Sequence, residues 1–398
     1  MLLVFEIFFW SFLAATFYAY VGYGLVLYIL LKIRQRNVPP ANFSDDFYPP
    51  VTIVIAAYNE AELLAEKIAN TLALDYPREL LKIIFVTDGS DDKSTDILAQ
   101  YPEVISAHRP ERKGKLAAVT RVLPAVTTPF TVFTDANTLL NAQALKLILR
   151  HFSNPATGAV AGEKRIRVKG EDAAAGAGEG FYWRYESRLK KWDAQLHSVV
   201  GAAGELFAIR TSLFEILPED TLIEDFVLTM KIAQKGFRVA YEPAAFALEA
   251  PSESIKEELK RKVRISAGGL QAVWRLSSLL NIFRYGWLSF QYISHRVLRW
   301  TLAPLGLPIV FLTNIALAID GGWFYQLSMG VQILFYLAAL TGYFLENHKI
   351  RLKILFIPYY FCLMNYAVYA GFFRLVTGRQ SVLWEKAQRE MVLKKDIQ

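Results

Sequence analysis

The sequence is poor in the residues that build sulfur and imidazole metal sites. Among its 398 residues, Cys362 is the sole cysteine, and the five histidines lack the spacing of a ligand set. An intramolecular disulfide and a cysteine-based metal site are therefore excluded. The glycine patterns of the P-loop and of the dinucleotide-binding fold are also missing, so a nucleotide site of either type is excluded.

Charge is missing from four long stretches, residues 8–31, 300–319, 323–345 and 354–373. As a helix, the first would be about 36 Å long, enough for a hydrocarbon core of about 30 Å. It follows Glu6 and is rich in phenylalanine and tyrosine, which is typical of a retained anchor rather than a cleaved signal peptide. The alternative is a set of buried helices in a large soluble core. We expect a multi-pass protein of the lipid bilayer.

Positive charge is in excess, with a net charge of +7 and a pI near 9.2. The basic residues gather beside the apolar stretches, which indicates the positive-inside pattern rather than a surface for nucleic acid. They are Lys32, Arg34 and Arg36, residues 256–264, Arg296 and Arg299, and residues 349–353. This predicts a cell inner (plasma) membrane protein with its N-terminus outside and residues 32–299 in the cytoplasm.

The basic C-terminal tail conflicts with three full trailing spans, which would place it outside. We therefore expect the stretch 354–373, which contains Pro358 and Asn365, to be re-entrant or interfacial.

The chain is thus expected to divide into five parts. These are an N-terminal transmembrane anchor, a cytoplasmic domain, an interfacial amphipathic helix, C-terminal transmembrane segments and a basic tail, at residues 1–36, 37–276, 277–299, 300–376 and 377–398. The cytoplasmic part is long enough for one α/β core.

Three short apolar runs in this part, residues 51–57, 81–87 and 130–134, have the composition of buried parallel strands. Helix-forming stretches follow the strands, so the fold class predicted is α/β with a doubly wound parallel sheet. Two of the runs end in carboxylates, Asp88 and Asp135. Because ligands of such sheets bind at the carboxyl ends of the strands, both acidic residues are candidates for a site.

Further along lie Asp225, in the run Leu-Ile-Glu-Asp-Phe-Val-Leu, and Arg264, in the basic run Lys-Arg-Lys-Val-Arg-Ile. Hydrophobic strands that end in carboxylates, followed by a basic cluster, are what a site for a metal-bound sugar diphosphate requires. The apolar stretches on either side indicate chemistry at a membrane surface.

In this order, the motifs resemble those of the family 2 glycosyltransferases. The likeness is greater to the membrane-embedded branch that includes the hyaluronan, chitooligosaccharide, poly-N-acetylglucosamine and cellulose synthases. The matching pieces are residues 51–61, 86–92, 113–115, 135–137, 201–210, 224–225 and 261–265. The resemblance implies a nucleotide-sugar domain of the GT-A-like type, inserted between transmembrane helices.

The resemblance also implies a donor site for a UDP-sugar. Asp88 would accept a hydrogen bond from the uracil, although it could instead only cap the following helix. Asp135 would face the diphosphate across a Mg²⁺ or Mn²⁺ ion, with Asn137 where the family usually has a second aspartate. The implied donor residues are Ala57, Tyr58, Glu60, Asp88, Lys115, Asp135, Ala136 and Arg261, and the implied metal ligands are Asp135 and Asn137.

Catalysis would rest on Asp225 as the general base that takes the proton of the acceptor hydroxyl. Glu224 would either support it or be a surface carboxylate. Arg264 would neutralise the departing diphosphate, unless the basic run is only a solvated patch beside the membrane. The family's Gln-x-x-Arg-Trp reads here as residues 261–265 with only the arginine kept.

On the acceptor side, the resemblance implies a loop in which small residues let a sugar approach the backbone, with Gly201, Gly204 and Glu205 as its residues. The function implied is an inverting hexosyltransferase that moves a sugar from a UDP-sugar, UDP-N-acetylglucosamine or UDP-glucose, to a growing polysaccharide, processively and coupled to export. The alternatives are a non-processive lipid glycosyltransferase, ceramide-type or polyprenyl-linked, and a non-catalytic membrane scaffold.

Overall fold

The structure, a computed structural model, describes residues 2–34, 47–166, 173–251, 254–347 and 352–383. The chain forms two compact units. The helical unit comprises Met1–Ile33, Val168–Leu189 and Glu258–Gln380, and the sheet unit comprises Arg34–Arg167, Lys190–Glu257 and Ser381–Gln398.

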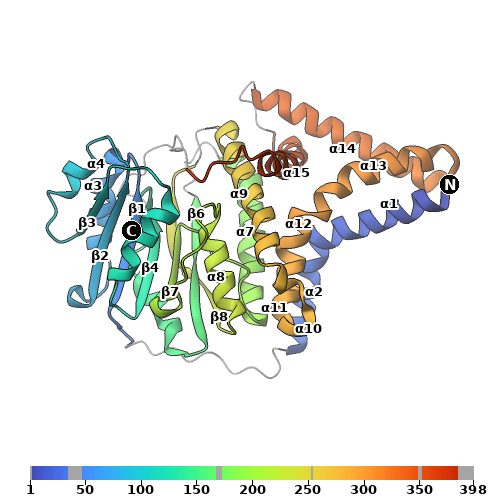
Figure 1. The fold of residues 1–398 in the computed structure, drawn as a ribbon. Helices are drawn as coiled ribbons and strands as arrows, with labels where there is room; N and C mark the ends of the chain where they lie inside the picture. The colour runs from blue at the N-terminus through green and yellow to red at the C-terminus, as the bar shows by residue number, and fades with distance from the viewer. Residues whose placement is uncertain (1, 35–46, 167–172, 252–253, 348–351, 384–398) are drawn as a thin grey trace. The chain divides into compact units, whose positions relative to one another are not determined.

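In the part of the chain that the structure describes, the sheet unit is built on one eight-stranded sheet of order β3-β2-β1-β4-β7-β6-β8-β5, whose strands other than β5 are labelled in Figure 1. The strands are β1 Val51–Ala57, β2 Leu81–Asp88, β3 Ile105–Arg109, β4 Phe130–Asp135, β5 Thr138–Leu140, β6 Thr157–Ile166, β7 Leu206–Arg210 and β8 Arg238–Glu249. All seven residues of β1 are buried, as expected for a central strand covered on both faces.

The predicted α/β class is confirmed, and the three predicted strands are β1, β2 and β4. Strands β1 to β4 pair in parallel, whereas β7 runs antiparallel to both β4 and β6, and β5 runs antiparallel to β8. The sheet is therefore mixed. An apolar run such as β7 looks the same in either direction, so its sequence did not reveal the reversal.

The register brings the predicted site residues to one edge. Ala57 of β1 pairs with Thr87, next to Asp88, and Ala56 pairs with Asp135. Asp88 and Asp135 therefore end the two strands that flank β1. The helices of this unit are α3 Ala61–Leu72, α4 Ser94–Leu98, α5 Lys115–Val122, α6 Ala144–Leu149 and α8 Glu224–Gln234.

Among the residues that the structure describes, the helical unit contains four helices that are long and apolar enough to cross a membrane: Leu2–Arg34, Leu302–Asp320, Trp323–Glu346 and Ile354–Val376. The first consists of α1 Leu2–Phe17, a π-helical segment Tyr18–Gly22 and α2 Tyr23–Arg34; the others lie in α13 Leu302–Asp320, α14 Trp323–Asn347 and α15 Lys353–Val376. Phe9 of α1 packs with Val310 and Leu317 of α13 and with Tyr325 of α14. These helices support the prediction of a membrane protein.

The segment before α13 is made of short helices, α10 Ile282–Tyr285, α11 Trp287–Tyr292 and α12 Leu298–Trp300. Two long helices have residues in both units, α7 Ala173–Leu196 and α9 Ile255–Arg275.

An ionic cluster is buried in the helical unit. Glu186 of α7 pairs with Arg296 at 2.8 Å, with Arg299 at 3.0 Å and with His295 at 3.2 Å. Arg299 also donates to the backbone carbonyl of Ala19, in the π-helical segment. The cluster ties α7, the first membrane helix and the short helices together.

Candidate active site

The loops that follow β1 and β2 hold each other in place. Asn59 has a positive φ of 53°. Its side-chain N–H donates to the Asp91 carboxylate at 2.6 Å, and its side-chain oxygen accepts the backbone N–H of Asp91 at 3.0 Å. A carboxylate oxygen of Asp92 accepts the first backbone N–H of α3, from Ala61, at 2.9 Å. The predicted donor residues Tyr58 and Glu60 therefore lie in a fixed loop.

Two of the predicted donor residues, Ala57 at the end of β1 and Ala136 directly after β4, are buried. Tyr58 follows Ala57, and the guanidinium of Arg112 lies over its ring, 3.8 Å from the ring centroid.

Asp88 is almost fully buried and is hydrogen-bonded to the loop before α5. Its carboxylate accepts the backbone N–H of Lys113 at 3.1 Å and that of Gly114 at 2.6 Å. The N-cap of the following helix α4 is Lys93, so Asp88 does not cap that helix. Gly114 has a φ of +96° and begins α5, so Asp88 determines where Lys115 lies.

Lys115 lies among the acidic residues of the site. Its Nζ is 2.5 Å from Asp135 and 3.5 Å from Glu224. Burial alone would lower the pKa of Lys115, but the carboxylates of Asp135, Glu224 and Asp225 outweigh it and raise the pKa above its ordinary value. Lys115 is therefore a fixed positive charge.

Asp225 and Glu224 form the first turn of α8. Burial, together with the neighbouring negative charge of Glu224, raises the pKa of Asp225 to about 7. A carboxylate with this pKa is suited to accept a proton at neutral pH, because a general base works best when its pKa is near the working pH.

The predicted acceptor loop approaches this pair closely. A side chain at Gly204 would place its Cβ 2.8 Å from the Lys115 Nζ and 3.3 Å from an Asp225 carboxylate oxygen. Gly201 has a φ of +82°, and a Cβ there would collide with the ring of Phe226. Gly204 thus leaves the space beside Asp225 free of a side chain, whereas Gly201 makes room for the ring of Phe226.

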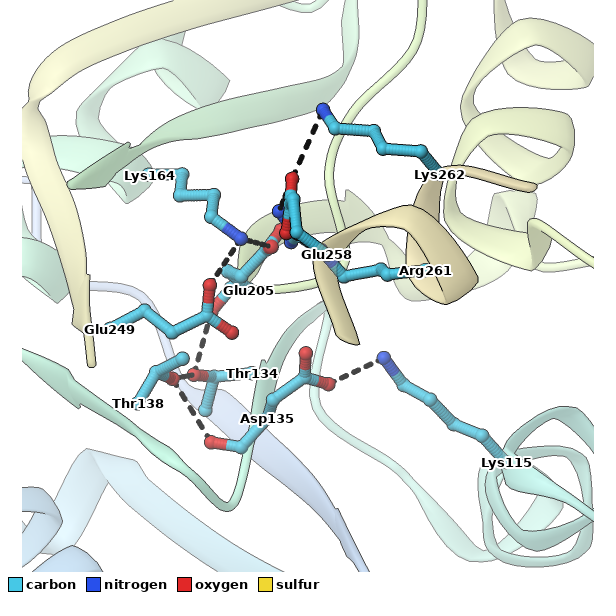
Figure 2. Close-up of polar contacts among 10 residues, drawn as sticks. All are labelled: Lys115, Thr134, Asp135, Thr138, Lys164, Glu205, Glu249, Glu258, Arg261 and Lys262. Carbon is cyan, nitrogen blue, oxygen red and sulfur yellow. Dashed lines mark hydrogen bonds and ion pairs between the residues drawn. The ribbon is translucent and has the colours of Figure 1, made fainter. Parts of the chain in front are cut away.

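Glu205 lies at the end of this loop, in a cluster that sequence reasoning missed. Its carboxylate pairs at 2.5 Å with Lys164 of β6, which also pairs with Glu249 of β8 (Figure 2). Lys164 and Glu249 are buried. The two carboxylates thus share the ammonium of Lys164.

Asp135 and Asn137, two positions apart at the end of β4, carry oxygen atoms of the kinds that a divalent metal accepts. The Asn137 side-chain oxygen is buried and has no hydrogen-bond partner among the described residues. Carboxylate and amide oxygens are ligands that Mg²⁺ and Mn²⁺ accept, and phosphate oxygens can complete the shell. Nowhere in the described part of the chain do three His, Cys, Asp or Glu side chains gather as a metal cluster.

Arg261 and Arg264 belong to α9, in the helical unit. Arg261 makes a two-point contact with Glu258, at 3.0 and 2.9 Å, and Lys262 lies 3.6 Å from the same carboxylate (Figure 2). The residues that the structure brings together in the sheet unit are instead Lys115, Asp135, Gly204, Glu224 and Asp225.

Residues 49–268 match the family described as glycosyltransferase-like family 2. The match covers more than half of the chain, which therefore belongs to this family, as its motifs predicted.

Similar proteins include the poly-β-1,6-N-acetyl-D-glucosamine synthase of Staphylococcus aureus (strain COL), 25% identical over 260 residues, which are 63% of this chain and 62% of that protein. A probable glycosyltransferase of Bacillus subtilis (strain 168), YdaM, is 26% identical over 259 residues, or 60% of each chain. The chain thus matches less than two thirds of the length of these relatives.

Among solved structures, the mannosyltransferase PcManGT of Pyrobaculum calidifontis, in complex with GDP-Man and Mn²⁺, has a TM-score of 0.72. It is 21% identical, and the superposition covers 94% of this chain and 99% of the other. This likeness supports the predicted fold of the GT-A type.

Proposed function

We propose that the protein is an inverting membrane glycosyltransferase that moves a sugar from a UDP-sugar to a growing polysaccharide. The observation that carries the proposal is the group formed by Asp225, Lys115 and Asp135 beside Gly204. In this group Asp225 is the proton acceptor, Lys115 is the fixed cation and Asp135 is the carboxylate that would face the diphosphate. Gly204 has no side chain, so its backbone leaves room for a substrate.

In this proposal Asp225 takes the proton of the acceptor hydroxyl. The hydroxyl oxygen forms a bond to the anomeric carbon as the bond from that carbon to the diphosphate breaks. UDP leaves with the electron pair, and the configuration at the carbon inverts. The ammonium of Lys115, now paired with Asp135, binds the diphosphate oxygens and offsets their negative charge.

Asp135 and Asn137 would hold a Mg²⁺ or Mn²⁺ ion, which neutralises charge on the diphosphate when bound. The similar mannosyltransferase was solved in complex with GDP-Man and Mn²⁺, which supports a divalent ion. The Asp88 carboxylate can accept a further hydrogen bond besides those from Lys113 and Gly114, and in this proposal it accepts one from the base of the nucleotide. Glu60 lies near the ribose. Arg261 and Arg264 act on the leaving diphosphate.

The polysaccharide product is favoured by the likeness to a poly-N-acetylglucosamine synthase. UDP-N-acetylglucosamine is accordingly the first donor to test. Four membrane-length helices suit a multi-pass enzyme of the inner membrane. We place its catalytic domain in the cytoplasm and infer that elongation is processive and coupled to export.

The test uses the full chain, purified into nanodiscs with Mg²⁺ or Mn²⁺ and given one nucleotide sugar at a time. UDP-N-acetylglucosamine, UDP-glucose and GDP-mannose are compared by nucleotide release and by product size. Release of UDP with a ladder of products supports the proposal. A single glycolipid would indicate the lipid glycosyltransferase, and release from GDP-mannose alone would contradict the donor assignment.

The matched control is Asp225→Asn in the same nanodiscs. It should bind the donor but release nucleotide far more slowly, which separates transfer at this site from a contaminating activity.

A further inference from the structure

Lys67 of α3 is a fully buried lysine on the apolar face of its helix, next to Leu64 and Ile68. Burying an ammonium ion is costly unless it is paired. Among the described residues, no carboxylate lies within ion-pair distance of its Nζ. Burial lowers the pKa of Lys67 to about 7, while the negative charge of Asp135 acts in the opposite direction. Packing alone therefore does not account for a lysine at this position.

Lys67 contacts the residues on either side of the turn that carries Asp135 and Asn137. Its Nζ donates to the backbone carbonyl of Thr138 at 2.7 Å and to the hydroxyl of Thr134 at 3.1 Å. Thr134 is the next-to-last residue of β4, and Thr138 is the first residue of β5. One ammonium group therefore holds the turn on both sides.

The same contacts continue to the acceptor side. The Thr134 hydroxyl donates to the backbone carbonyl of Glu205 at 2.8 Å, directly before β7 (Figure 2). The Thr138 hydroxyl donates to the carbonyl of Asp135 at 3.0 Å and so braces the turn from within. Lys67 is thus linked to both sides of the site without touching either proposed substrate.

We propose that Lys67 is a positioning residue whose buried ammonium fixes the donor turn 135–137 and, through Thr134, the end of the acceptor loop at Glu205. The proposal rests on the function proposed above. It assigns a role in the reaction to a residue that is remote from the reacting atoms. Removal of the ammonium loosens the turn and the loop together, whereas removal of the Thr134 hydroxyl loosens chiefly the loop.

Asn70 offers a matched control on the same helix. Its side chain donates to and accepts from the backbone of Leu140, both at 2.8 Å, at the far end of β5. Asn70→Ala therefore removes two hydrogen bonds between α3 and β5, as Lys67→Met does between α3 and the turn, but leaves the turn in place.

The experiment measures binding of UDP with Mn²⁺ by calorimetry, together with kcat and KM for UDP-N-acetylglucosamine, on full-length protein in nanodiscs. Lys67→Met should weaken UDP binding about tenfold or more, because the turn that carries Asp135 and Asn137 loses the two hydrogen bonds that hold it. Asn70→Ala should stay within about threefold of wild type, because its contacts lie away from the ligand. Equal effects of the two variants on UDP binding would overturn the proposal.

Thr134→Val and Thr134→Ser keep the test valid if Lys67→Met does not fold. The valine variant should lose turnover more than UDP affinity, and the serine variant, which keeps the hydroxyl, should restore it. Loss in both variants to the same extent would overturn the link to Glu205. Wild-type protein that neither binds UDP nor releases it would refute the proposed function itself, and this inference with it. Normal wild-type binding and turnover with no effect in Lys67→Met would refute only the inference.

Discussion

The proposed mechanism predicts that Asp225 is needed for the transfer step but not for binding of the donor nucleotide. Asparagine has nearly the same shape, and the Lys115 contacts with Asp135 and Glu224 do not depend on Asp225. Asp225→Asn should therefore keep the fold and the affinity for UDP. The amide cannot accept the proton, so turnover should fall by about 10² to 10⁴, the usual contribution of a positioned general base.

This loss corresponds to about 3 to 5 kcal/mol of transition-state stabilisation, at about 1.4 kcal/mol per factor of ten. The assay pairs initial rates of UDP release with UDP titration by calorimetry on the same preparation. Near wild-type turnover in Asp225→Asn would refute the assignment and would direct attention to Glu224. Equal losses of affinity and rate would indicate that Asp225 binds the donor instead of acting as the base.

Three further predictions follow from the same residues. In the proposed mechanism the ionised form of Asp225 is the active one, and its pKa is raised to about 7, so kcat/KM should rise with pH up to about 7 and then level off. Glu224→Gln removes a negative neighbour of Asp225 and should therefore move the rise in kcat/KM to lower pH. An unchanged pH profile in this variant would contradict the influence of Glu224 on the pKa of Asp225. Asn137→Asp should lower the metal concentration for half-maximal activity because it adds a charged ligand beside Asp135, whereas full activity of the wild type in EDTA would exclude the metal. Asp88→Ala should weaken UDP binding by about 1–3 kcal/mol in calorimetry, with a smaller effect on the maximal rate, because it removes a hydrogen-bond acceptor and frees the loop before Lys115; unchanged affinity would exclude Asp88 from the donor site.

The sequence predicted the parts of the fold that depend on local pattern. A short apolar run is a local signal, so β1, β2 and β4 were predicted within a residue or so at each end. The direction of β7 depends instead on its pairing with β4 and β6, which no local pattern encodes.

The same distinction applies to the site. Asp135 and Asp225 stand out in their motifs, whereas Lys67, Lys164 and Glu249 gain meaning only from partners distant in the sequence. The one local signal for Lys67 was a lysine on an otherwise apolar helix face, between Leu64 and Ile68.

The antiparallel direction of β7 has a consequence for how such enzymes diversify. The donor loops leave the carboxyl ends of β1, β2 and β4, but the acceptor loop enters β7 at its amino end. Because β7 pairs along its length with β4 and β6, we expect an exchange of side chains in the loop before Gly204 to leave the strands of the donor loops in place. Under the proposed function, such an exchange would alter the preference for an acceptor more than the binding of the nucleotide.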